Sequence, residues 1–182
     1  GFLYQQNTMR DALVAGIHLN IFNKHCDRVK MANIAQMVNV LQSMILTEGE
    51  KMIKTPTYYV FHMYRFHQDA ELVESSIEAE TIGVDEWKVP KLQESASVAA
   101  DGTLNITVNN LSATADAPVE LFITDTEIHQ ITAEIVTNEM HAMNTFEAPD
   151  TVTEAAFTEF KHENGKISFV LPACSVMHIA VK

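Results

Sequence analysis

Residues 8–24 carry apolar side chains at spacings of three and four, which is the pattern of a helix with one apolar face. The stripe consists of Met9, Leu13, Ile17 and Ile21. Asn7 or Thr8 can act as the N-cap of this helix. Alanine and glycine residues beside the stripe indicate close packing against a sheet. We therefore predict a buried helix rather than a surface one.

A short apolar run follows this helix and ends at the amides of Gln36 and Asn39. Apolar runs of this length between turn signals are typical of strands that are buried on both faces. We therefore predict a strand over residues 29–36, and a cluster of polar residues around Gly49 predicts a loop over residues 43–51.

A second helix is predicted over residues 55–67, with Thr55 as its N-cap and Pro56 at its first position. A strand between two helices is the smallest unit of a parallel α/β sheet, and one strand cannot form such a sheet. The first third of the chain is therefore typical of the end of a larger fold.

Beyond residue 69 the spacing of apolar residues changes to two, which predicts strands. These strands are expected over residues 72–82, 94–99, 103–108, 119–124, 132–136, 154–160, 166–170 and 176–181. Turn signals separate them, including Asn109-Asn110 and Asp116-Ala117-Pro118. Several short strands at this spacing favour an antiparallel β-sandwich, with a domain boundary near residue 68.

Composition narrows the class of protein. The chain has 182 residues, of which 47% are hydrophobic, and its 24 acidic and 12 basic residues give a formal net charge of -12. A globular protein is expected, with neither nucleic acid nor a membrane as partner, because phosphate groups attract clustered Lys and Arg. Gly1 is not an initiator residue, and we expect the natural protein to begin upstream of it. The sequence does not indicate a cellular location.

Metal and thiol chemistry find no support in the spacing of residues. His62 and His67 are five apart and fall on different faces of a helix, and neither HExxH nor CxxC occurs. His25 and Cys26 are adjacent, so their side chains point apart. Cys26 and Cys174 are expected to be packed free thiols. No metal and no cofactor is predicted.

The residues alone do not provide a complete catalytic set. The irregular segment over residues 141–150 can be a functional loop or a crossover between strands. On this basis the chain is an α/β piece joined to a β-sandwich, and its function stays open.

Three segments of the first third together resemble the α-L-arabinofuranosidases of glycoside hydrolase family 51. They are RDALV, HCDRVKMANIAQMVNVLQ and TPTYYVF. The similarity covers essentially the whole chain and continues more weakly in ASVAADGTLNITVNNLS, MHAMNTFEAP and LPACSV. None of these segments would be specific by itself.

The resemblance implies a (β/α)₈ barrel followed by an all-β, jelly-roll-type sandwich. Residues 1–67 would then be the last helix–strand–helix of the barrel, with residues 29–36 as its eighth strand. Residues 68–182 would be the C-terminal sandwich.

Gln36 matches the family's glutamine that hydrogen-bonds arabinose in the glycone subsite. Active sites of such barrels lie at the carboxyl ends of the strands, where Gln36 is predicted to lie. An amide suits this role because it both donates and accepts hydrogen bonds. The alternative is an amide that satisfies local backbone at the end of the strand.

Both catalytic glutamates of the family would lie upstream of Gly1, so no catalytic residue is assigned in this chain. Retaining glycosidases need two carboxylates about 5–5.5 Å apart. Asp85-Glu86-Trp87 resembles the tripeptide of the family's nucleophile, but it follows the last barrel helix. We therefore interpret Glu86 as a loop residue.

The implied function is that of the C-terminal part of a retaining exo-α-L-arabinofuranosidase. The whole enzyme would release terminal arabinofuranosyl groups from arabinan or arabinoxylan, while this part would supply Gln36 and a scaffold and would be inactive alone. Its partners would be an arabinose-containing oligo- or polysaccharide, the rest of the barrel and further copies of the enzyme. The alternative is a non-catalytic β-sandwich module for oligomerisation or carbohydrate binding.

Overall fold

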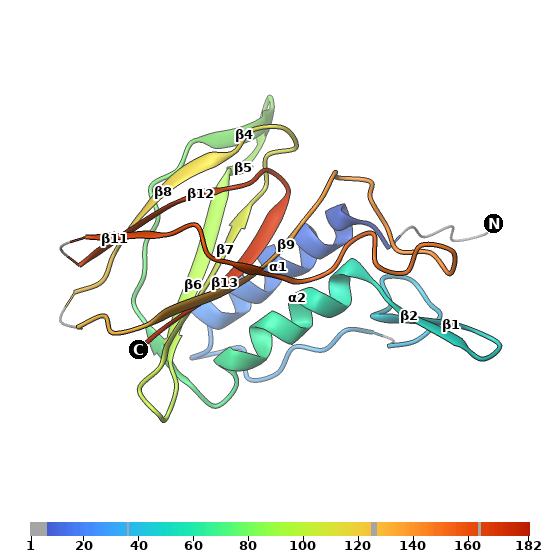
Figure 1. Cartoon of the computed structure of the whole chain (residues 1–182), viewed down its shortest axis with the longest axis horizontal. Coiled ribbons are helices and arrows are strands. Elements are labelled where there is room, and N and C mark those ends of the chain that lie inside the picture. The colour runs from blue at the N-terminus through green and yellow to red at the C-terminus, as the bar shows by residue number, and fades with distance from the viewer. Residues whose placement is uncertain (1–6, 36, 125–126, 164) are drawn as a thin grey trace.

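A six-stranded antiparallel sheet forms the middle of three layers in the computed structural model (Figure 1). Its strands, in spatial order, are β10 (Ala155–Phe157), β9 (Ile131–Thr137), β13 (Ser175–Val181), β7 (Leu104–Asn110), β6 (Leu92–Val98) and β3 (Glu71–Val73). One face carries the sheet β11 (Lys161–Glu163), β12 (Lys166–Leu171) and β8 (Ala117–Phe122). The other face carries helices α1 (Met9–Lys24) and α2 (Pro56–Tyr64). The structure describes residues 7–35, 37–124, 127–163 and 165–182.

The two sheets enclose an apolar core, as the period of two predicts. In β13, Met177, Ile179 and Val181 point into this core, and the residues between them point to the helices. On the facing sheet, Ile167 and Phe169 of β12 complete the core. The prediction of a β-sandwich is confirmed, and two helices belong to the same packed structure.

Helix α1 begins as predicted, at Thr8. The backbone N–H of Thr8 donates to Oδ2 of Asp11 at 2.8 Å, and its hydroxyl donates to the same oxygen at 3.0 Å. The next two N–H groups, of Met9 and Arg10, donate to carbonyl oxygens of residues 142 and 140 at 2.9 and 3.0 Å. Both carbonyls belong to residues 138–154, the crossover between β9 and β10. This crossover therefore satisfies backbone N–H groups in the first turn of α1.

Gly16 lets α1 approach the sheet closely. A Cβ atom at Gly16 would lie 2.7 Å from Nδ2 of Asn109, which is fully buried on β7. The hydroxyl oxygen of Tyr64 on α2 lies 3.0 Å from the carbonyl oxygen of Gly16. The predicted packing of this helix against a sheet is confirmed, and both helices meet the sheet at this point. The prediction of a fully buried helix is wrong, because Ile21 of the predicted stripe is 43% exposed.

Hydrogen bonds between side chains join the helices to the sheet. Oδ1 of Asn20, on α1, accepts from the hydroxyls of Tyr64, Ser95 and Thr107, each at 2.8 Å. Burial raises the pKa of Tyr64, so this hydroxyl keeps its proton and remains a donor. The layer between the helices and the sheet is thus largely polar at its centre.

Helix α2 is extended by a 3₁₀ turn, η1 (Arg65–His67), which ends at a half-buried histidine. Nδ1 of His67 lies 2.7 Å from Oγ of Ser97, and Nε2 lies 3.1 Å from Oγ1 of Thr107. Burial lowers the pKa of His67 to about 4. The imidazole is therefore neutral at pH 7 and can donate from one nitrogen while it accepts at the other.

The predicted strand over residues 29–36 is not formed in the part that the structure describes. Residues 29–35 pair with no strand there, and Met31 is 78% exposed. A strand needs neighbours for its backbone groups, and the described residues offer only one bridge nearby, between Val38 and Ile45.

Several other boundaries also differ from prediction. The expected loop at residues 43–51 contains a hairpin, β1 (Ile45–Glu48) and β2 (Lys51–Lys54), with Gly49 at φ +58° in its turn. The expected strand at residues 72–82 is interrupted, and β4 (Thr81–Val84) forms a second hairpin with β5 (Trp87–Pro90). Asn109-Asn110 ends β7 rather than forming a turn.

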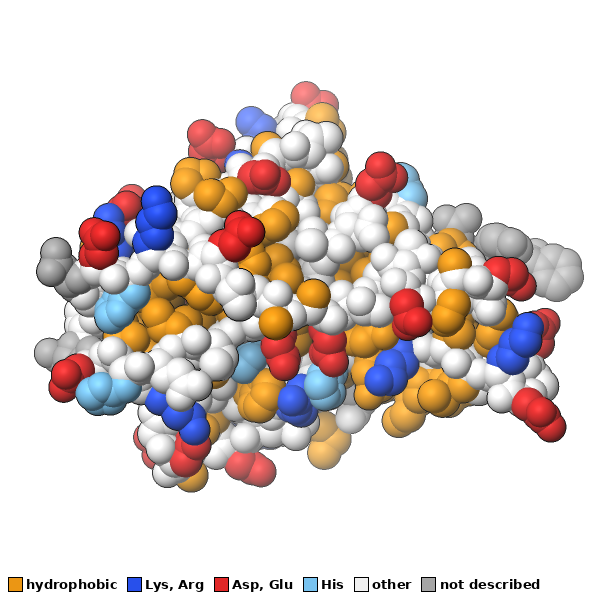
Figure 2. Space-filling model, in the orientation of Figure 1, with side chains coloured by type: hydrophobic (Ala, Val, Ile, Leu, Met, Phe, Trp, Pro, Cys, Tyr) orange, Lys and Arg blue, Asp and Glu red, His pale blue; other side chains and the backbone are white. Residues whose placement is uncertain are grey.

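The two cysteines differ in environment. Cys174 is buried and free, as predicted, whereas Cys26 is free but exposed, because it follows α1 on the solvent side. Acidic side chains are spread over the face in Figure 2 between basic and apolar ones. Within the described part, neither helix is long and apolar enough to cross a membrane.

The close approach of α1 predicts the effect of Gly16→Ala. Alanine is preferred over glycine inside a helix by about 1 kcal/mol, but overpacking a buried contact costs about 1–3 kcal/mol. We expect a net loss of about 1 kcal/mol in the free energy of unfolding, measured with urea. In an Asn109→Ala background the same change should be neutral or stabilising. If Gly16→Ala has the same free energy of unfolding as the parent, Asn109 can move away from the added methyl group without cost, and the prediction is wrong.

The half-buried, neutral His67 predicts a loss of stability in acid. Its folded pKa lies below the unfolded value of 6.5, so the unfolded chain binds a proton first as the pH falls. Its contribution is therefore complete above pH 6.5 and is lost between pH 6.5 and about 4, by up to about 3 kcal/mol. His67→Gln should flatten this part of the pH profile, and the exposed control His129→Gln should not. Parallel profiles for the parent and His67→Gln would contradict the assignment.

Candidate functional site

The predicted sugar contact, Gln36, lies outside the described residues. Its neighbours line a pocket of about 400 Å³ against the two helices. The lining includes Val14, His18 and Phe22 of α1, Thr57 and Phe61 of α2, and residues 32–35. Val14 and Ile21 are 39% and 43% exposed, so α1 presents an apolar face on the side away from the sheet. In parallel α/β folds such a face packs on strands.

Glu86 lies where the sequence predicts, in a turn. It occupies the tip of the β4–β5 hairpin, between Asp85 at φ +50° and Trp87, which is 77% exposed. The hairpin forms a separate two-stranded sheet that projects from the sandwich. The interpretation of Glu86 as a loop residue is confirmed.

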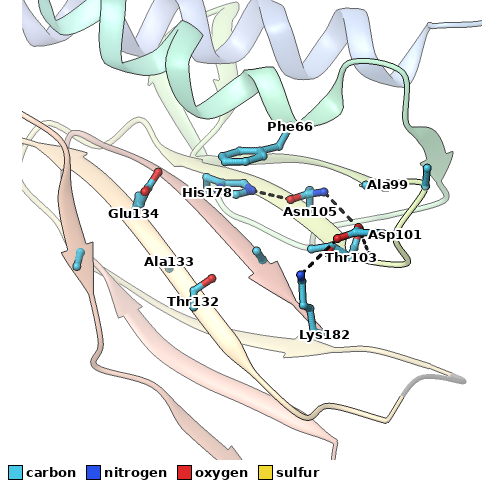
Figure 3. Close-up of a pocket in the computed structure, with 13 residues that line it drawn as sticks. Phe66, Ala99, Asp101, Thr103, Asn105, Thr132, Ala133, Glu134, His178 and Lys182 are labelled. Carbon is cyan, nitrogen blue, oxygen red and sulfur yellow. Dashed lines mark hydrogen bonds and ion pairs between the residues drawn. The ribbon is translucent and has the colours of Figure 1, made fainter.

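A larger pocket, of about 680 Å³, lies on the helix-facing side of the six-stranded sheet, beside the end of α2 (Figure 3). Its polar and aromatic lining includes Phe66, Thr103, Asn105, Thr132, Glu134 and His178. Alanines of β9, β10 and β13 form much of the remaining wall, which leaves the space open above the sheet. Sequence analysis did not predict this pocket, because the end of η1 and four separate segments of the β region form it.

His178 is the central side chain of this pocket. Its ring stacks on that of Phe66, with centroids 4.4 Å apart and planes at 11°, and its Nε2 donates to Oδ1 of Asn105 at 2.9 Å. Burial lowers the pKa of His178 to about 4, and the nearby His67 and Arg65 act in the same direction. His178 is therefore neutral at pH 7 and held by two partners, which suits a structural or hydrogen-bonding role more than proton transfer.

Beside this pocket, a histidine and two glutamates converge from three elements. His62 comes from α2, Glu134 from β9, and Glu154 directly precedes β10. Nδ1 of His62 lies 2.8 Å from Oε2 of Glu154, and one ligand atom from each of the three residues lies within 4.8 Å of the others. Oε2 of Glu134 is buried without a hydrogen-bond partner. No spacing rule could find this cluster, because residues 62, 134 and 154 are far apart in the chain.

The cluster brings two carboxylates close to the separation that a retaining glycosidase uses, about 5–5.5 Å. Its setting differs from that of a nucleophile and its acid partner, because His62 holds Glu154 and α2 lies over the group. The arrangement can hold a cation or form an ion pair, and both fit its charge better than acid–base catalysis.

Comparison with known proteins identifies the family. Residues 1–175 match the model of the α-L-arabinofuranosidase C-terminal domain. An intracellular exo-α-L-arabinofuranosidase from Bacteroides ovatus is 43% identical over all of this chain, which spans 36% of that protein's length.

Solved structures show the same relationship. The arabinofuranosidase of glycoside hydrolase family 51 from Xanthomonas axonopodis pv. citri superposes with a TM-score of 0.94 at 39% identity, over 100% of this chain and 37% of that one. An arabinose complex of the α-L-arabinofuranosidase from Thermotoga maritima gives a TM-score of 0.82 at 26% identity, over 96% of this chain and 38% of that one. The chain therefore belongs to the α-L-arabinofuranosidase C-terminal domain family, the C-terminal part of glycoside hydrolase family 51 proteins.

Proposed function

We propose that this chain is the C-terminal part of a retaining exo-α-L-arabinofuranosidase that acts on terminal arabinofuranosyl groups of arabinan or arabinoxylan. The observation that carries the proposal is the match to the family over residues 1–175, together with 43% identity to an enzyme whose name gives an exo activity.

Residues 1–67 are proposed to complete a (β/α)₈ barrel, and residues 68–182 to form a jelly-roll sandwich packed against it. Two observations support the barrel. Helix α1 exposes Val14 and Ile21 on the face away from the sheet, and residues 32–35 line a pocket together with Val14. Strands from an upstream part of the enzyme would cover both.

Gln36 is proposed to hydrogen-bond the arabinose in the glycone subsite. Its neighbours at residues 32–35 lie along the pocket between α1 and α2, at the surface that the rest of a barrel would cover. A structure of a relative from Thermotoga maritima was solved as an arabinose complex. An amide can donate to one sugar hydroxyl and accept from another, which orients the ring.

The two catalytic carboxylates are proposed to lie upstream, so this chain would be inactive alone. In support, Glu86 sits at the tip of an exposed hairpin. The other carboxylate pair discussed above, Glu134 and Glu154, lies under α2 at the edge of the sandwich rather than at strand ends of a barrel.

A second candidate is a non-catalytic role of the sandwich in assembly. Exposed apolar side chains support it: Val84 and Trp87 on the β4–β5 hairpin are 71% and 77% exposed, and Phe122 on β8 is 67% exposed. Exposed apolar groups of this size are typical of contact surfaces between proteins.

Hydrolysis of an aryl α-L-arabinofuranoside tests the main proposal. We expect turnover by the intact enzyme and none by the 182-residue chain, because the carboxylates would be missing. In the intact enzyme, Gln36→Ala should lower kcat/KM by about 10- to 100-fold, the effect of losing hydrogen bonds worth about 1–3 kcal/mol.

The matched control is Gln68→Ala, an exposed amide that follows η1, and its kcat/KM should equal that of the parent. Turnover by the short chain would refute the upstream location of the carboxylates. Loss of that turnover in Glu134→Gln would then place the chemistry in the sandwich.

Sedimentation of the intact enzyme tests the role in assembly. Trp87→Ala removes the most exposed large apolar group of the β4–β5 hairpin, so we expect a smaller mean mass at equal concentration. Glu86→Ala, in the same turn, is the control and should not change the mass. Equal masses for all three proteins would contradict the role in assembly. If arabino-oligosaccharides then release heat on titration into the parent but not into Trp87→Ala, carbohydrate binding is favoured instead.

A further inference from the structure

The edge of the six-stranded sheet meets α2 at a cluster of three potential ligands. Strands β9 and β10 pair so that Ala156 lies opposite Glu134. Glu154 is two residues before Ala156, so both glutamates lie on the face of the sheet that α2 covers. Figure 3 shows Glu134 on this face, and His62 reaches Glu154 from α2.

Among the described residues, no lysine or arginine forms an ion pair with Glu134 or Glu154. His62 neutralises at most one of the two carboxylates, through its contact with Glu154. Oε2 of Glu134 is buried and accepts no hydrogen bond, which is unfavourable for a carboxylate. Two cations in this region have other partners. Nζ of Lys54 lies 4.6 Å from the centroid of the Tyr58 ring, and Arg65 donates to the carbonyl oxygen of His62 and lies over the ring of Phe66.

The negative potential extends to a neighbouring side chain. Burial raises the pKa of Tyr59, and the charges of Asp150 and Glu154 raise it further. The region between α2 and the crossover that follows β9 is therefore acidic. A cation would be attracted to it and would remove the charge that Glu134 leaves uncompensated.

The donor atoms select a class of cation. Ca²⁺ and Mg²⁺ favour sets made of oxygen alone, whereas one imidazole nitrogen with carboxylate oxygens suits Zn²⁺ and its first-row neighbours. Tetrahedral ligands at about 2.0–2.1 Å from zinc lie about 3.4 Å apart. The three ligand atoms lie within 4.8 Å of one another here. Side-chain rotations that move the carboxylate oxygens by little more than about 1 Å would therefore form the site.

The surroundings fit a bound ion. The ring of Tyr58 stacks on His62, with centroids 6.0 Å apart and planes at 13°, and this contact restrains the imidazole. His62 and Glu154 are 33% and 28% exposed, which leaves a path for the ion and room for water as a fourth ligand.

We propose that His62, Glu134 and Glu154 bind one divalent transition-metal ion, with Zn²⁺ preferred, and that this ion fixes α2 to the β9–β10 edge of the sandwich. The site joins three elements that are distant in the chain, so its effect is structural. Since Glu134 also lines the 680 Å³ pocket, the ion would form part of that pocket's wall.

Zinc binding to the tag-free, chelator-treated protein tests the proposal, in the intact enzyme and in the 182-residue chain. Titration against a chromophoric chelator should show one equivalent of Zn²⁺ bound. Loss of a residue that only hydrogen-bonds a metal ligand already weakens metal binding by about tenfold or more. Glu134→Gln and Glu154→Gln each remove a ligand, so each should weaken binding by at least that factor. Glu159→Gln, which removes an exposed carboxylate five residues after Glu154, should bind as the parent does.

Thermal unfolding gives a second readout that does not depend on activity. Zinc should raise the Tm of the parent and of Glu159→Gln, and should leave that of Glu134→Gln unchanged. Equal zinc affinity in the parent and Glu134→Gln would overturn the proposal and assign any binding to other histidines among the eight. Failure of the parent to bind a stoichiometric ion would overturn it as well.

Discussion

The fit of α1 onto the sheet is the constraint on which the rest of the structure depends. Gly16 brings the helix backbone to Asn109 with no room for a Cβ atom, and the carbonyl oxygen of Gly16 lies 3.0 Å from the hydroxyl of Tyr64 of α2. One close approach therefore fixes both helices relative to β7. The position of the segment after β9 is then fixed as well, because its carbonyl oxygens accept hydrogen bonds from the first turn of α1.

The polar character of this contact gives it a single register. An apolar helix can shift along an apolar sheet at little cost, whereas Asn20 accepts three hydroxyl donors whose positions are set by α2, β6 and β7. A shift of α1 would leave those buried groups unsatisfied. The same layer needs His67 to be neutral, so that it can both donate and accept between Ser97 and Thr107. The helices are thus held by specific hydrogen bonds, and by apolar burial on either side of them.

Sequence reasoning succeeded where the signal is local. Thr8 and Thr55 begin the two helices as capping rules predict, and the period of two located most strands of the sandwich. It failed where tertiary contacts decide. Asn109 and Asn110 have the composition of a turn, yet they end β7, where Asn109 meets α1 and Asn110 donates to the carbonyl oxygen of Leu171. The hairpin β1–β2 was missed because its strands are short and bury only one side chain, that of Ile53.

The candidate sites divide in the same way. Gln36 was assigned from a family resemblance and not from its chemistry, since an amide at the end of an apolar run has several possible uses. The cluster of His62, Glu134 and Glu154 was invisible, because only the pairing of β9 with β10 and the placement of α2 bring the three together. The 680 Å³ pocket depends on η1 ending above His178, which is again a tertiary feature.

The failure of the strand prediction at residues 29–36 has a physical cause that bears on the whole protein. An apolar run becomes a strand only when neighbours satisfy its backbone, and the described residues supply no such neighbours to 29–35. On the same side of the molecule, α1 presents Val14 and Phe22 to a pocket that Ala32 and Ile34 also line. Two apolar surfaces, one on α1 and one on residues 32–35, thus lie side by side. A single layer of upstream strands would pair with the segment and cover the helix, so both surfaces have one explanation, which is the barrel proposed above.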